Sequence, residues 1–175
     1  DMQEQKVSII ADNREMPSGI LSVLKSLDVE TEFKQLDSGD YICSDRVCVE
    51  RKTVADFLSS ITDGRLFEQL KGLKEVFEIP ILIVEGKTDS LFSDRNIHPN
   101  AIKGSLPSIA IDYRIPILWT LNIGETGSQL FSIAKREQIQ GNRTPSIRVS
   151  KKVRSTKELQ EYFISGLPDI NSVLS

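Results

Sequence analysis

The chain has 175 residues, of which 39% are hydrophobic, and its 22 Lys and Arg residues against 25 Asp and Glu residues give a formal net charge of −3. This length suits one compact domain with a sizeable core and is short for two. The sequence contains neither the ~20 consecutive apolar residues of a membrane span nor a secretory signal, which excludes membrane-spanning and secreted classes. We therefore expect an intracellular piece of a longer protein, from the cytoplasm of an archaeon or the nucleus of a eukaryote.

Charge is unevenly distributed, which matters for the choice of partner. An acidic net charge argues mildly against a nucleic-acid binder, because phosphate binding needs clustered Lys and Arg. Residues 135–157, however, contain eight Lys and Arg residues against Glu137 alone. This stretch is as compatible with a solvated basic linker as with a DNA contact. The two cysteines, Cys43 and Cys48, are expected to be free thiols with no metal role.

In the first part of the chain, hydrophobic spacing predicts a strand, an acidic loop and a helix, at residues 7–11, 12–15 and 20–27. Three β-prone runs then predict an antiparallel meander or hairpin with a polar turn at 44–46; the runs cover residues 31–35, 39–43 and 47–50. Thr53 occupies an N-cap position, and two helical patterns follow it, ending near residue 77.

The second part alternates strands and helices. Residues 80–85 and 117–121 have the pattern of strands buried on both faces. Helices are predicted at 99–113, with a break or kink near Gly104 and Pro107, and at 125–140. This order predicts an α/β fold in which helices flank a mixed central sheet. We expect residues 1–140 to form the main domain, 141–155 a basic linker, and 156–175 the start of a further helical region.

Two acidic residues converge in the predicted hairpin. Asp40 begins one strand and Glu50 ends the next, so an antiparallel turn brings both carboxylates to the same end of the sheet. Asp12 can join them if the first strand lies beside the hairpin, and Glu15 is a short loop away. Carboxylates gathered at one sheet edge repel one another unless a hard cation is present, and Mg²⁺ or Mn²⁺ prefers such oxygen ligands. The sequence therefore predicts a divalent-metal site.

The residues after Glu50 have complementary chemistry. Strand alternation places Glu50 and Lys52 on one face and Arg51 on the other, provided that the strand continues. Lys52 could then orient or help deprotonate an attacking water and balance charge on a phosphate, while the metal lowers the pKa of that water. Taken singly, each of these residues is more simply interpreted as a charged strand end. The joint occurrence of acids and lysine at strand ends favours a nuclease site.

Three further residues remain open to two interpretations. Asp56 could support catalysis or simply favour the dipole of the first helical turn. Arg65 and Gln69 lie four residues apart on one helix face, where they could bind phosphate or form a surface pair.

The residues Gly39-Asp40-Tyr41 with Val49-Glu50-Arg51-Lys52, followed by Asp56, resemble the GD…ERKxxxD signature of the XPF/Hef family of structure-specific endonucleases. Further segments resemble the family between residues 7 and 140, and the similarity is greatest to archaeal Hef. The resemblance implies a restriction-endonuclease-like core, Mg²⁺ or Mn²⁺, homodimers or heterodimers, and cleavage of branched DNA such as 3′-flaps and forks.

Carried over by position, the resemblance implies a role for each site residue. Asp12, Asp40 and Glu50 match metal ligands, and Arg51 and Lys52 match catalytic positions. Glu15, Asp56, Arg65 and Gln69 match supporting positions; we assign Glu15 to the metal, Asp56 to catalysis, and Arg65 and Gln69 to the substrate.

Residues 162–170 resemble only the opening of the helix-hairpin-helix domain that usually follows in this family, with Asp169 where a glycine is common. Two other functions compete with a branched-DNA endonuclease. One is a catalytically silent DNA-binding or dimerisation subunit of the same fold, against which the intact acids and lysine argue. The other is a site-specific or RNA-directed nuclease on the same core.

Overall fold

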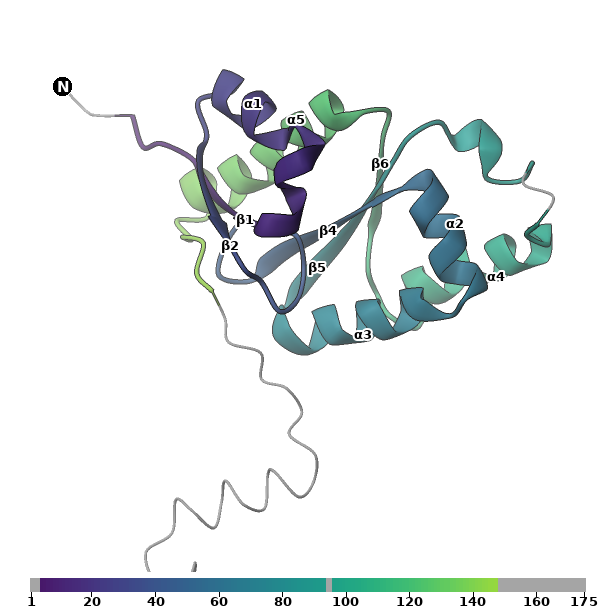
Figure 1. Ribbon diagram of the computed structural model, residues 1–175. Coiled ribbons are helices and arrows are strands. Elements are labelled where there is room, and N and C mark those ends of the chain that lie inside the picture. Colours follow the sequence, from purple (N-terminus) through teal and green to yellow (C-terminus); the bar gives the residue numbers. More distant parts are fainter. Residues whose placement is uncertain (1–3, 94–95, 148–175) are drawn as a thin grey trace, which may run out of the picture.

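The computed structural model describes residues 4–93 and 96–147, which form a six-stranded sheet covered by helices (Figure 1). The strands lie in the order β2-β1-β3-β4-β5-β6. Their bounds are β1 Ser8–Asp12, β2 Glu30–Lys34, β3 Tyr41–Ile42, β4 Val47–Thr53, β5 Ile79–Glu85 and β6 Ile117–Thr120. β3 is antiparallel to β1 and β4, whereas β1 with β2 and β4 with β5 and β6 pair in parallel. The predicted mixed sheet is confirmed.

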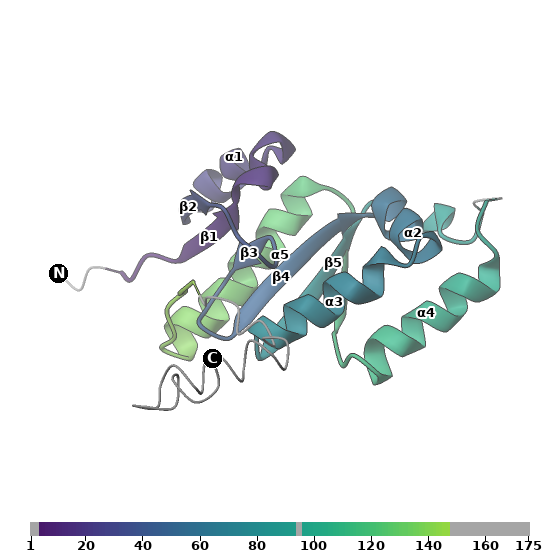
Figure 2. The same ribbon diagram turned by 60° about the horizontal axis from the view of Figure 1, so that its bottom comes forward.

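Within the described ranges, five α-helices cover the two faces of the sheet, and Figure 2 shows α1 and α5 on one side with α2, α3 and α4 on the other. Their bounds are α1 Ile20–Ser26, α2 Val54–Thr62, α3 Arg65–Val76, α4 Pro99–Ile111 and α5 Ile123–Lys135. Short turns complete the described elements: the 3-10 turns η1 Asn13–Ser18 and η2 Thr88–Ser90, and the π-helical turn η3 Arg136–Gln140. The hydroxyl of Thr53 accepts the amide of Asp56 at 3.2 Å, which confirms the predicted N-cap of α2.

Alternation along the strands decides which side chains enter which layer. Val47 and Val49 of β4 join the core beneath α1 and α5, whereas Cys48 packs towards α3. In β5, Ile83 faces the first core, and Leu82 and Val84 face the helices of the other layer. The side chains of Glu50 and Lys52 are therefore directed to the α3 side and that of Arg51 to the α5 side, as predicted. β4 continues to Thr53, so the strand persists through Lys52.

The run at 31–35 does not belong to an antiparallel meander, and that part of the prediction is wrong. It forms β2, an edge strand parallel to β1, with Ser8 opposite Glu30. The chain can return in parallel because α1 provides the crossover between the two strands.

Two predictions in the second half are also corrected. β6 is the other edge of the sheet, and its Trp119 is 42% exposed, so this strand is not buried on both faces. α4 runs without a break through Pro107, because the hydrogen bond that proline cannot donate would end at Lys103, an exposed residue where water can replace it.

Three other expectations concern the two cysteines, membrane-spanning helices, and the segments after residue 140. Cys43 and Cys48 are buried free thiols, as expected. Within residues 4–93 and 96–147, no helix combines the length and apolar character needed to cross a bilayer. Most of the predicted linker and all of the predicted 156–175 region lie outside the described residues.

Candidate active site

The carboxyl groups of Asp40 and Glu50 lie beside each other at the junction of β3 and β4. Tyr41 pairs with Val49, and the amide of Asp40 donates to the carbonyl of Val49 at 3.0 Å, so Asp40 is opposite Glu50. The carboxylate of Asp40 also accepts the backbone amide of Arg51 at 2.8 Å. Asp40 is 8% exposed. The predicted hairpin thus brings these two acids together.

Gly39 permits the close approach of the chain to β4. Its φ is +79°, and a Cβ at this position would lie 2.1 Å from Sγ of Cys48. Only glycine adopts such a backbone readily and leaves this space free. The glycine of the Gly39-Asp40 pair is therefore explained by packing, and it sets the position of the acid that follows.

Burial is the main cause of a raised pKa at both acids. Burial, with the negative charges of Glu50 and Glu15, raises the pKa of Asp40 to about 8. Burial also raises the pKa of Glu50, although the positive charges of Lys52 and Arg14 act in the opposite direction. An acid pair of this kind favours either a bound proton or a cation.

Asp12 lies on the same side of the sheet, but its carboxylate has other partners. It accepts hydrogen bonds from the backbone amide of Leu36 at 2.9 Å and from Nε of Arg14 at 2.5 Å. Burial alone would raise the pKa of Asp12, but the hydrogen bonds from Leu36 and Arg14 outweigh it and lower the pKa. This carboxylate is therefore ionised, and both of its oxygens already accept hydrogen bonds.

Glu15 also contacts groups other than the acid pair. Its Oε2 accepts the hydroxyl of Tyr41 at 2.5 Å and Nη1 of Arg51 at 3.3 Å. Among the described residues, no three His, Cys, Asp or Glu side chains are grouped so that they could hold a metal ion. Ligation by all four predicted acids therefore stays a prediction, and the structure brings together Asp40 and Glu50.

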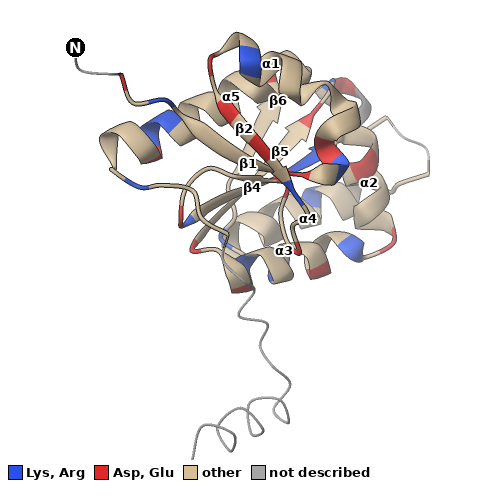
Figure 3. Ribbon diagram, turned by 60° about the vertical axis from the view of Figure 1, so that its left-hand side comes forward, with Lys and Arg blue, Asp and Glu red and all other residues tan. Residues whose placement is uncertain are grey.

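A cavity of about 360 Å³ opens beside this pair. Glu50 borders it from β4, Arg14 from the turn η1, and Gln69 from α3. The remaining lining residues are Asp37, Ser38, Gly39, Glu68 and Gly72. Acidic and basic stretches of backbone meet around the strand ends in Figure 3. One predicted substrate residue, Gln69, thus shares a cavity with one predicted acid.

Three other predicted residues, Lys52, Asp56 and Arg65, are not among the residues that line this cavity. Arg65 begins α3 and pairs with Asp63 at 2.7 Å, with its side chain 59% exposed. Asp56 is exposed in the first turn of α2. Lys52 is partly buried and close enough to Glu50 for its charge to oppose the rise in the pKa of that acid.

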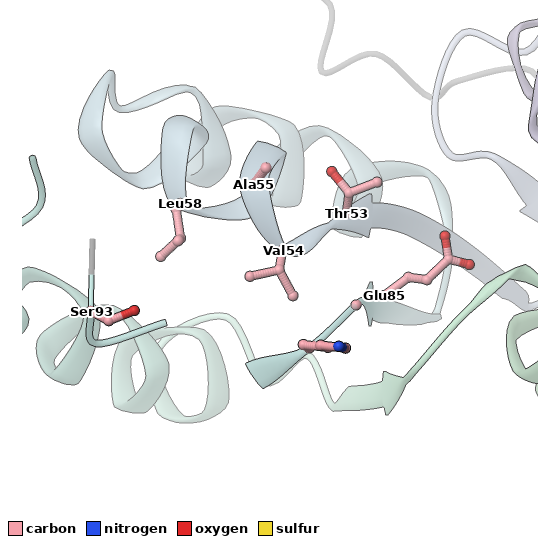
Figure 4. Close-up of a pocket in the computed structure, with 8 residues that line it drawn as sticks. Thr53, Val54, Ala55, Leu58, Glu85 and Ser93 are labelled. Carbon is pink, nitrogen blue, oxygen red and sulfur yellow. The ribbon is translucent and has the colours of Figure 1, made fainter. Parts of the chain in front are cut away.

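Arg51 reaches a residue that sequence reasoning missed. Its Nε donates to Oε2 of Glu85 at 3.1 Å, and its Nη2 contacts the same oxygen. Glu85 ends β5, opposite Thr53 of β4, and is 8% exposed. The only sequence signal for Glu85 is a charged residue that closes an apolar strand. A hollow of about 530 Å³ lies next to it, lined by Thr53, Val54, Ala55, Leu58, Gly86, Lys87 and Ser93 (Figure 4).

Comparison with known proteins identifies the family to which this chain belongs. Residues 11–133 match the family model described as the ERCC4 domain. A Methanocaldococcus jannaschii protein named as an ATP-dependent RNA helicase is 44% identical over 172 residues, which cover 98% of this chain and 21% of that protein. The 3′-flap repair endonuclease Xpf of Saccharolobus solfataricus is 35% identical over 173 residues, covering 97% of this chain and 73% of the relative.

The fold is also found among solved structures. XPF from Aeropyrum pernix in complex with DNA has a TM-score of 0.69 and 30% identity, and the match covers 93% of this chain and 75% of that one. The chain thus spans about a fifth of the first relative and about three quarters of the other two proteins. With the family model covering most of its length, the chain belongs to the ERCC4 nuclease-domain family of XPF and Hef proteins.

Proposed function

We propose that this chain is the active nuclease domain of a structure-specific endonuclease. It hydrolyses phosphodiester bonds in branched DNA during repair or replication-fork processing, in the cellular compartment that contains this DNA. The observation that carries the proposal is the pair formed by buried Asp40 and half-buried Glu50, with Lys52 on the same side of β4, beside an open cavity. The name of the Saccharolobus relative, a 3′-flap repair endonuclease, supports the choice of a flap or fork as substrate.

The acid pair fits a divalent cation. Two adjacent carboxyl groups with raised pKa values favour positive charge between them, and all-oxygen ligands suit Mg²⁺ or Mn²⁺. Asp40 and Glu50 would hold the ion, while Asp12 and Glu15 would join only by leaving their present partners. When bound, the ion supplies a water of lowered pKa and stabilises charge on the phosphate.

The chain's own groups would orient the reactants. Lys52 extends from the same face as Glu50, where it would hold the attacking water and balance the negative charge that develops on the phosphate. Gln69, which shares the cavity with Glu50, would bind the DNA backbone, and Arg65 at the start of α3 would add a second backbone contact. Contacts of this kind position DNA without reading its bases, which suits recognition of a branch shape.

The active form pairs with a second copy of this chain or with a related subunit. Large apolar side chains near α4, β6 and α5 support this assembly: Ile111 is 71% exposed, Trp119 42% and Leu121 62%. Exposed apolar groups at element ends are suited to an interface. Sedimentation at micromolar concentration tests it, with Leu121→Glu expected to shift the chain to monomer and Phe92→Ser, at an exposed apolar residue elsewhere, expected not to.

Incubation of the dimeric protein with a labelled 3′-flap and Mg²⁺ or Mn²⁺ tests the enzyme activity. Cleavage near the junction is expected, with Asp40→Asn inactive. Asp28→Asn is the matched control, because Asp28 is an exposed acid with a φ of +57°, which asparagine tolerates. No metal-dependent product would support the catalytically silent subunit instead. A second flap of different sequence is included, because cleavage that follows base sequence would favour the site-specific or RNA-directed nuclease.

A further inference from the structure

We propose that Glu85 is a positioning residue of the nuclease site, which fixes Arg51 and thereby the stretch of β4 that carries Glu50 and Lys52. The inference rests on the proposed function, and it assigns a task to a buried acid outside the ERK sequence. Three observations carry it: the contacts of Arg51, the contacts of the second carboxylate oxygen of Glu85, and the alternation of β4.

Arg51 is held between two acids from different elements. Its Nε and Nη2 both contact Oε2 of Glu85, and its Nη1 donates to Glu15 at 3.3 Å. All three side chains are largely buried, with exposed fractions of 15% for Arg51, 11% for Glu15 and 8% for Glu85. A guanidinium keeps its charge when buried, so it needs such partners and is held firmly by them.

The other oxygen of Glu85 is anchored to the far side of the sheet. Thr126, in the first turn of α5, donates its hydroxyl to Oε1 of Glu85 at 2.8 Å. The same hydroxyl shares a 2.7 Å hydrogen bond with Thr120, and both threonines are buried. The amide of Gly86 donates to the carbonyl of Thr120 at 2.8 Å. Figure 4 shows Glu85 at the strand end beside Thr53, the last residue of β4. Both carboxylate oxygens of Glu85 are therefore occupied.

Because side chains alternate along β4, contacts that fix Arg51 also fix its two neighbours in the strand. The side chain of Arg51 enters the α5 side, while its neighbours on each side, Glu50 and Lys52, face the cavity side. A fixed Arg51 side chain holds the backbone between them, and the amide of Arg51 in turn binds the carboxylate of Asp40 at 2.8 Å. One buried chain of contacts therefore runs from α5 through Glu85 and Arg51 to the acid pair.

The experiment compares Glu85→Gln with Glu137→Gln in the full chain. Glu137 is also buried and also binds an arginine with both oxygens, since Arg46 lies 2.8 Å and 3.0 Å away, but it belongs to the opposite end of the domain. We expect Glu85→Gln to lower kcat for flap cleavage at least tenfold with less than a twofold change in KM. Glu137→Gln should leave both constants unchanged, and Glu85→Asp should recover part of the loss.

A second readout needs no cleavage. The ¹⁵N–¹H signal of the Arg51 Nε group reports its hydrogen bond, and we expect it to shift in Glu85→Gln and Thr126→Val but not in Glu137→Gln. An unchanged Arg51 signal in Glu85→Gln would overturn the positioning role. Equal losses of kcat in Glu85→Gln and Glu137→Gln would overturn it too, because that result indicates general destabilisation. Absence of cleavage by the wild-type chain overturns the proposed function, while the Arg51 signal still decides this inference.

Discussion

The carboxylate of Asp40 accepts the backbone amide of Arg51 at 2.8 Å, while the side chain of Arg51 leaves β4 on the opposite side to bind Glu85 and Glu15. One residue thus links two groups of charges that the sheet separates. On the cavity side, burial raises the pKa values of Asp40 and Glu50, and the negative charge of Glu50 adds to the rise at Asp40. On the α5 side, one arginine balances two acids. The pair of Asp40 and Glu50 has an excess of negative charge, whereas the contacts of the Arg51 side chain fix the part of β4 beside that pair.

Replacement of Asp40 by asparagine is expected to raise stability while it abolishes cleavage. The amide removes the buried negative charge of Asp40 beside Glu50, and its Oδ1 can still accept a hydrogen bond from the amide of Arg51. We expect the free energy of unfolding without metal at pH 8 to rise by about 2 kcal/mol, as charge neutralisation at a strained active site commonly does. Urea denaturation measures it. A variant less stable than wild type would contradict the repulsion between Asp40 and Glu50.

The same repulsion predicts how stability depends on pH. Asp40 has a pKa of about 8 in the folded chain, against an ordinary value near 4 when unfolded. Its stabilising contribution is complete below about pH 4 and is lost as the pH rises through about 8, because the folded state keeps a proton that the unfolded chain releases. Thermal unfolding without metal should therefore shift to lower temperature between pH 5 and 8, and the slope should be smaller in Asp40→Asn. Parallel slopes would assign the effect to other groups.

The pair of buried Glu137 and partly exposed Arg46 predicts the opposite pH dependence. The hydrogen bond from Arg46 lowers the pKa of Glu137 below its ordinary value, so its contribution is present above the unfolded pKa and lost as the pH falls through the folded one. At pH 7, Glu137→Gln should lower the free energy of unfolding, because it removes the charged partner that binds both Nε and Nη2 of Arg46. Chemical denaturation at pH 7 and pH 3 measures it, and the difference between variant and wild type should shrink at pH 3.

Substitution of Gly39 tests how closely the backbone at this position approaches Cys48 of β4. Gly39→Ala would place a methyl group 2.1 Å from Sγ of Cys48 at a φ of +79°, and we expect a loss of about 3 kcal/mol in the free energy of unfolding. Gly104→Ala is the control, because nothing lies within 4 Å of that position on α4 and alanine favours a helix. Equal effects of the two substitutions on urea denaturation would contradict the close approach at Gly39.

The sequence was sufficient to predict the parts of the site that depend on strand alternation. A hairpin and a period of two place Asp40, Glu50 and Lys52 on one side and Arg51 on the other. The partner of Arg51 depends on a parallel pairing between β4 and β5, in which Arg51 lies opposite Ile83 and Glu85 opposite Thr53. No local pattern determines that register. The same holds for Asp12, whose carboxylate binds the amide of Leu36 from the segment after β2.

Addition of a divalent cation at high pH should restore the stability that is lost when Asp40 ionises. If Asp40 and Glu50 hold Mg²⁺ or Mn²⁺, binding to the folded chain alone raises its stability with the logarithm of the metal concentration. At pH 8, where a proton no longer neutralises Asp40, we expect a rise in melting temperature with 10 mM Mg²⁺ that corresponds to about 1 to 3 kcal/mol. The rise should be smaller at pH 6, because metal and proton compete for the same oxygens, and it should be lost in Asp40→Asn and kept in Asp28→Asn. An equal rise in Asp40→Asn would place the bound cation elsewhere, whereas its loss only in that variant would identify the acid pair as the metal site.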